Sequence, residues 1–136
     1  MRTLILVSLL IVGFFDPKPN APVADNLDGV WIPVKQEMGG NILPKAAFEK
    51  QKLIVADNTY TFVAESVDKG EVKYGDGKMD IYGKEGVNKG RHFMCIYKIE
   101  NNQLFVCYNL TGDAYPASYD TRPRATLFLS VFEREK

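Results

Sequence analysis

Histidine is almost absent from this sequence: His92 is the only one among the 136 residues. A serine or cysteine nucleophile that relies on a histidine base would have to use His92, and no G-x-S-x-G motif accompanies it. Metal ligands are equally scarce, because His92, Cys95 and Cys107 would form at most an incomplete zinc site and the sequence has no H-E-x-x-H or C-x-x-C motif. We therefore expect no metal, no cofactor and no catalysis of this kind.

Carboxylates are the remaining candidates for catalysis, and several are concentrated in the middle of the chain: Glu65, Asp68, Glu71, Asp76, Asp80 and Glu85. Two of them would act as a glycosidase pair if they converged at the right separation. Most, however, lie beside lysine and glycine in predicted turns, where exposed charged side chains keep a protein soluble. The sequence therefore predicts a protein that is not an enzyme.

Charge of one sign is also missing. Lysine plus arginine number 17, as do aspartate plus glutamate, so the formal net charge is zero, and no run of like charges occurs. Binding to phosphate backbones requires a concentrated cationic face. Nucleic acid is therefore not an expected partner.

Long hydrophobic runs are absent except at the N-terminus, where 4–15 is apolar apart from Ser8 and Gly13 and follows Arg2. This run has the length of the hydrophobic part of a secretion signal and is shorter than the ~20 residues of a membrane-spanning helix. A proline-rich segment, 16–22, follows it. We predict that 1–24 is a signal peptide and linker, that cleavage falls between Phe14 and Asp25, and that 25–136 is one exported domain.

Helical periodicity is also weak, and short alternating runs between glycine, asparagine and aspartate predict an all-β domain. One short helix is expected at 44–50, after the first strand, with Pro44 at its first position. Positive φ angles are expected in tight turns at 39–41, 57–58, 68–70, 76–77 and 101–102. The eight candidate strands are 30–38, 52–56, 59–65, 71–74, 78–82, 91–99, 103–108 and 125–133.

Eight hairpin-linked strands leave two free edges unless the sheet closes, so we predict an antiparallel up-and-down barrel. In such a barrel the first strand runs beside the last, which makes Trp31 and Arg134 neighbours. The tryptophan ring and the guanidinium would then either stack and seal one end of the barrel, or serve as ordinary core and ordinary surface.

The segment Leu27-Asp28-Gly29-Val30-Trp31, together with Arg134, resembles the G-x-W motif and terminal arginine of lipocalins. The wider spacing is similar to a family of small exported bacterial proteins with a lipocalin-like domain of unknown function, abundant in planctomycetes. The matching features are Gly40, Leu43-Pro44, Tyr60, Asp80-Ile81, Gly86, Asn88-Lys89-Gly90, Ile96-Tyr97, Leu104, Cys107, Pro116, Tyr119 and Glu133-Arg134. The family has no established activity, so the resemblance implies a lipocalin-like barrel and export but assigns no site. Cys95 and Tyr115 depart from it, since they replace a usual glycine and a usual arginine.

The register of one hairpin decides whether the two cysteines can pair. A two-residue turn at 101–102 places Ile96 opposite Cys107 and leaves Cys95 on the other side of the sheet, whereas a three-residue turn places Cys95 directly opposite Cys107. We expect the two-residue turn and free thiols.

The aromatic residues are the one group that suggests a binding site, because Tyr60 and Phe62 share a strand face, as do Phe93 and Tyr97. With Leu104 and Tyr108 on the adjoining strand, they form the predicted wall of a ligand cavity. An eight-stranded barrel either fills its interior with side chains or holds one small ligand. Two functions therefore remain open: binding of a small hydrophobic or amphipathic ligand, and binding of a protein or cell-envelope partner by a barrel with a packed interior. The sequence leaves the oligomeric state open.

Overall fold

A computed structural model describes residues 26–136, which form nine β-strands and one short 3-10 helix. The predicted signal peptide and linker, 1–24, lie outside these residues, so export stays a prediction. The elements are β1 (Gly29–Met38), β2 (Asn41–Ile42), η1 (Lys45–Ala47), β3 (Lys52–Ala56), β4 (Thr59–Val63), β5 (Val67–Gly75), β6 (Lys78–Glu85), β7 (His92–Glu100), β8 (Gln103–Asn109) and β9 (Leu127–Arg134).

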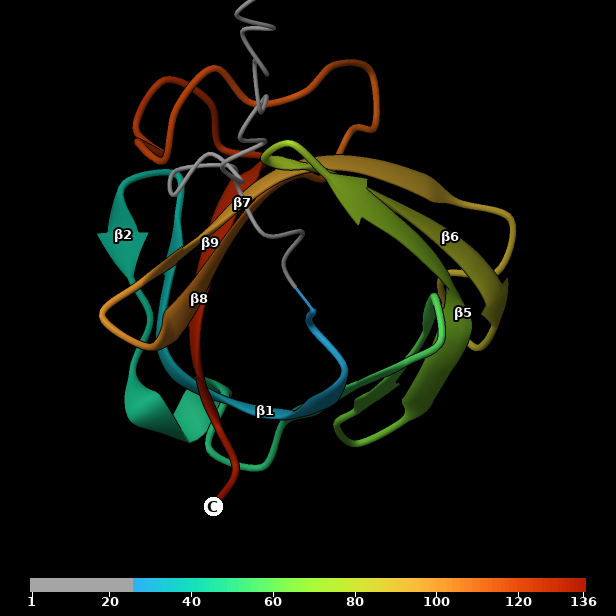
Figure 1. Cartoon of the computed structure of the whole chain (residues 1–136). Helices are drawn as coiled ribbons and strands as arrows, with labels where there is room; N and C mark the ends of the chain where they lie inside the picture. The colour runs from blue at the N-terminus through green and yellow to red at the C-terminus, as the bar shows by residue number, and fades with distance from the viewer. Residues whose placement is uncertain (1–25) are drawn as a thin grey trace, which may run out of the picture.

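Eight of the strands close into an antiparallel barrel in up-and-down order, as predicted (Figure 1). The barrel closes where β1 pairs with β9, from Trp31 opposite Arg134 to Met38 opposite Phe128. The other edge of β1 pairs first with β3 and then, at its end, with the two-residue strand β2. A bulge between Pro33 and Lys35 interrupts the β1–β9 register, which suits a proline that has no N–H to donate.

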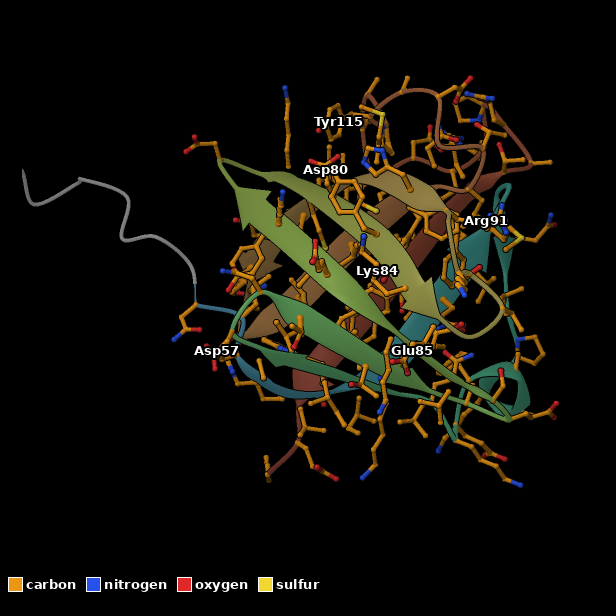
Figure 2. All side chains as sticks on the ribbon, turned by 90° about the vertical axis from the view of Figure 1, so that its right-hand side faces the viewer. Asp57, Asp80, Lys84, Glu85, Arg91 and Tyr115 are labelled. Atoms are coloured by element: carbon orange, nitrogen blue, oxygen red, sulfur yellow. The ribbon has the colours of Figure 1, made fainter. Side chains whose placement is uncertain are left out.

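The two ends of the barrel are built differently. At one end, here called the closed end, three tight turns join β3 to β4, β5 to β6 and β7 to β8, and their first residues Asp57, Asp76 and Asn101 all have positive φ as predicted. At the other end, here called the open end, longer connections at 64–66, 86–91 and 110–126 join the strands. Figure 2 shows Asp57 at the closed end and Arg91 at the open end.

One local prediction is confirmed only in part, and another is wrong. The helix expected at 44–50 is only the 3-10 turn η1, because isolated short helices are marginal and Phe48 leaves helical geometry to bury its ring. The turn expected at 68–70 lies within β5, and the chain turns at 64–66 instead. Gly70 is required there by close packing rather than by a turn, since a Cβ at this position would collide with the carbonyl of Tyr82 and the ring of Tyr60.

Hydrophobic side chains are buried on both faces of the barrel wall. The interior holds the main core, which includes Trp31, Tyr97 and Val106. A second, smaller cluster lies outside the wall, where Tyr119 of the long connection 110–126 packs against Cys107 and Leu129. Within residues 26–136, no helix has the length and hydropathy needed to span a membrane.

Candidate ligand-binding cavity

All six residues of the predicted cavity wall point into the barrel. Strand alternation places Phe93 and Tyr97 of β7 on the inner face with Cys95, and the register pairs Cys95 with Tyr108 and Tyr97 with Val106 of β8. On the opposite wall, Val55 and Leu53 of β3 pair with Tyr60 and Phe62 of β4 in the same inward set. The expected grouping of these aromatic faces is therefore present.

The barrel interior is not filled, and it contains a cavity of about 350 Å³. Five of the six predicted residues line it: Tyr60, Phe62, Phe93, Leu104 and Tyr108. The other apolar lining residues are Leu27, Leu53, Val55, Val72, Met79, Ile81, Leu110 and Phe128. The cavity reaches the open end, because the exposed residue Arg91 and the half-buried Phe62 and Leu110 are part of its lining.

Tyr97 is the one predicted residue that does not line the cavity. Its ring lies nearer the closed end, edge-on to Tyr74 with the centroids 5.8 Å apart. The Tyr74 hydroxyl in turn accepts a hydrogen bond from the backbone N–H of Leu27 at 3.1 Å. Tyr97 therefore belongs to the packed part of the core below the cavity floor.

The closed end is sealed by the predicted contact between Trp31 and Arg134. The Arg134 guanidinium lies 4.3 Å from the Trp31 ring centroid and donates to the carbonyl oxygens of Asp28 and Asn26 at 2.7 and 2.8 Å. The indole N–H of Trp31 donates to the Leu27 carbonyl oxygen at 2.8 Å. These bonds tie the segment that precedes β1 across the end of the barrel.

No protein-family model, curated protein or solved structure matches this chain. What the cavity can bind must therefore be judged from its own residues.

Three polar residues line the cavity beside the two tyrosines, and sequence reasoning missed all of them: Asp68, Asn88 and Arg91. Asp68 is only 6 % exposed, and its Oδ1 accepts a hydrogen bond from the backbone N–H of Asn88 at 3.2 Å. Arg91 donates to the carbonyl oxygen of Leu110 at 3.3 Å and lies 4.9 Å from the Phe93 ring centroid. The sequence carries one sign that Asp68 points into the barrel, because Asp68, Gly70 and Val72 alternate along one strand face. Aspartate followed by lysine and glycine is, however, more typical of a turn.

The two cavity tyrosines keep their protons across the physiological range. Burial raises the pKa of Tyr60, and the nearby Asp68 carboxylate raises it further. Burial also raises the pKa of Tyr108, with smaller contributions from Cys95, Tyr60 and Cys107. Within residues 26–136 neither hydroxyl has a hydrogen-bond partner, so both are neutral groups available to a molecule in the cavity.

The groups considered for catalysis lie elsewhere. His92 is a partly exposed residue at the start of β7, and its Nε2 lies 2.7 Å from Oδ1 of Asp80 on the outer face of the barrel. Tyr115 donates from its hydroxyl to the other Asp80 oxygen at 2.8 Å, and Figure 2 shows Tyr115 beside Asp80. In the part of the chain that the structure describes, no three His, Cys, Asp or Glu side chains are grouped so as to hold a metal ion.

Proposed function

We propose that this protein is an exported, lipocalin-like barrel that binds a small apolar or amphipathic molecule in its interior. The observation that carries the proposal is the cavity of about 350 Å³ inside the barrel. Ligand sites are concave, have volumes of roughly 300–1,000 Å³, and combine an apolar lining with a few polar groups. The cavity agrees with this description in size, in its aromatic and aliphatic walls, and in its few polar residues.

Two further features support the proposal. The apolar run at 4–15 favours export, where a binding protein would meet ligands outside the cytoplasm. The open end gives a route of entry, because the cavity lining continues to the exposed residue Arg91.

A pair of aromatic substitutions tests the proposal by titration with the neutral fluorescent probe N-phenylnaphthylamine. We expect wild type to bind the probe and Phe62→Ala to bind it about tenfold or more weakly, because the lost ring removes wall area worth ~1.5–3 kcal/mol when fully covered. Tyr97→Ala is the matched control, since this ring is buried outside the cavity lining. The Tyr97→Ala variant should lower the free energy of unfolding by ~3–5 kcal/mol, because it leaves a cavity in the packed core.

A wild type that binds no probe would contradict the proposal. Native mass spectrometry of the freshly purified protein gives a second, independent measurement, because a bound natural ligand would add a defined mass.

A second candidate function, binding of a protein or cell-envelope component, is favoured by one feature of the outer surface. The Tyr82 ring stacks on His92 with centroids 4.3 Å apart, and the Lys73 ammonium lies 5.5 Å from the Tyr82 centroid. Tyrosine is enriched at protein interfaces relative to the rest of the surface. If wild type binds no probe and the Tyr82→Ala variant loses binding to a partner, this outer surface is the functional site.

A further inference from the structure

The cavity is polarised along the barrel axis. Its deeper part, toward the closed end, is lined by aliphatic side chains that include Leu27, Val55 and Met79. Asp68, Asn88, Arg91 and Tyr108 lie in or beside the open-end connections, whereas Tyr60 lies opposite Val55 near the start of β4. A ligand that fits this distribution has an apolar body at the inner end and a polar group nearer the mouth.

Among the residues that the structure describes, two phenol groups provide unpaired hydrogen-bonding groups within the cavity. Tyr60 is on β4 and Tyr108 is on β8, on different walls of the barrel, and both line the cavity. Neither hydroxyl bonds to another group within residues 26–136. A neutral phenol donates and accepts, so a ligand oxygen can form a hydrogen bond with either hydroxyl.

The charges around the cavity disfavour an anionic ligand. Asp68 is a buried carboxylate in the lining, and it is a diagonal neighbour of Tyr60, because β5 pairs Asp68 with Phe62 and Gly70 with Tyr60. Among residues 26–136, the only lysine or arginine in the lining is Arg91, whose guanidinium is already engaged by the Leu110 carbonyl and the Phe93 ring at the exposed rim. A ligand carboxylate beside Tyr60 would therefore meet a like charge without a free cation to offset it.

We propose that the ligand is an uncharged amphipathic molecule whose hydroxyl or carbonyl oxygen bonds to the Tyr60 or the Tyr108 hydroxyl while its hydrocarbon body fills the inner cavity. This inference rests on the proposed function, because it requires that the cavity binds a ligand at all. It names the chemical class: a neutral alcohol or ketone rather than a fatty acid.

A displacement experiment tests the proposal. Octane, octanol and octanoate are each titrated against N-phenylnaphthylamine bound to the full chain at neutral pH. We expect octanol to bind more tightly than octanoate. In the double variant Tyr60→Phe/Tyr108→Phe, octanol should bind roughly twofold to tenfold more weakly than in wild type, because a neutral hydrogen bond is lost, while the affinity for octane is unchanged. Asp68→Asn should strengthen octanoate binding more than octanol binding.

Tyr74→Phe is the matched control, since it removes a phenol hydroxyl that lies outside the cavity lining. It should leave octanol binding unchanged, and denaturant unfolding of each variant confirms that it is folded. Octanoate binding more tightly than octanol, or equal losses for octane and octanol in the double variant, would overturn the inference while the proposed function stands. Failure of every compound to displace the probe, or absence of probe binding, would overturn the proposed function as well.

Discussion

At the scale of single residues, the two cysteines illustrate how one position of register controls chemistry. The two-residue turn is confirmed, since Ile96 lies opposite Cys107 and both thiols are free. Burial raises the pKa of Cys107 to about 11, and it raises that of Cys95 well above its ordinary value. Both thiols are therefore protonated and enclosed in the folded protein.

We predict that the native protein reacts slowly with a thiol reagent at pH 8 and that two thiols react at once after unfolding without reductant. Ellman titration in the presence and absence of denaturant measures both quantities. Reduction before unfolding is the control and should not change the count. An unreduced, unfolded protein with no reactive thiol would contradict the register of the β7–β8 hairpin.

Asp113 in the long connection 110–126 has a pKa well below its ordinary value. Hydrogen bonds from the Thr111 hydroxyl and the Asn109 amide, in that order, lower the pKa of this exposed carboxyl from 3.8 to about 2. Because the folded-state pKa is depressed, the stabilisation from these bonds is present above about pH 4 and is lost as the pH falls toward 2.

An NMR titration of the side-chain carboxyl carbons is expected to give Asp113 an apparent pKa near 2. Thr111→Val removes the hydroxyl that contributes most and should raise this pKa toward its ordinary value. Ser118→Ala, in the same connection but without a bond to Asp113, is the control. An ordinary Asp113 pKa in wild type would contradict the hydrogen-bond arrangement.

At the scale of elements, the turn between β7 and β8 allows a prediction of how substitutions in a tight hairpin change the free energy of unfolding. Asn101 and Asn102 both have positive φ, at 52° and 62°, in the conformation of a two-residue hairpin turn. Asn102→Val should lower the free energy of unfolding by ~1–2 kcal/mol, because a β-branched residue is strained in the left-handed region. Asn102→Gly should cost much less. Both values come from denaturant unfolding.

Asn41→Val is a suitable comparison for the turn variant, because Asn41 is exposed in strand β2 and does not have positive φ. Its effect should stay within ~0.5 kcal/mol. Equal costs at the two positions would contradict the assigned turn conformation.

At the scale of the whole molecule, the closure of the barrel depends on the contact between β1 and β9. Arg134→Met would remove two bonds to backbone carbonyl oxygens and the contact with the Trp31 ring. Since Arg134 is exposed, we expect a loss of about 1–2 kcal/mol in unfolding free energy, measured by denaturant titration. Probe binding should be retained, because the cavity opens at the opposite end.

Arg122→Met provides the control for this prediction. The Arg122 guanidinium pairs with Asp120 on the surface, where ion pairs contribute little to the free energy of unfolding. A loss at Arg134 no larger than that at Arg122 would mean that the Trp31–Arg134 contact does not hold the barrel closed.

The sequence by itself determined the eight barrel strands, most of the turns and the closure into a barrel, but not the short strand β2 or the first residues of β5. These features are encoded locally, since strands follow a period of two and the turns 57–58, 76–77 and 101–102 contain residue types that tolerate positive φ. Closure then follows from topology, because an even number of antiparallel strands brings Trp31 beside Arg134. The inward grouping of Tyr60 with Phe62 and of Phe93 with Tyr97 required only this alternation.

Only the tertiary structure decided which inward residues line open space and which are packed. Alternation assigns Tyr97 and Phe93 to the same face, yet one ring packs against Tyr74 and the other borders the cavity. Asp68 and Arg91 reach the cavity from a strand and a connection distant in sequence, and neither carries a local signal of this position. A cavity exists where side chains from opposite walls fail to meet, so its shape depends on all eight strands together and cannot be deduced from any one of them.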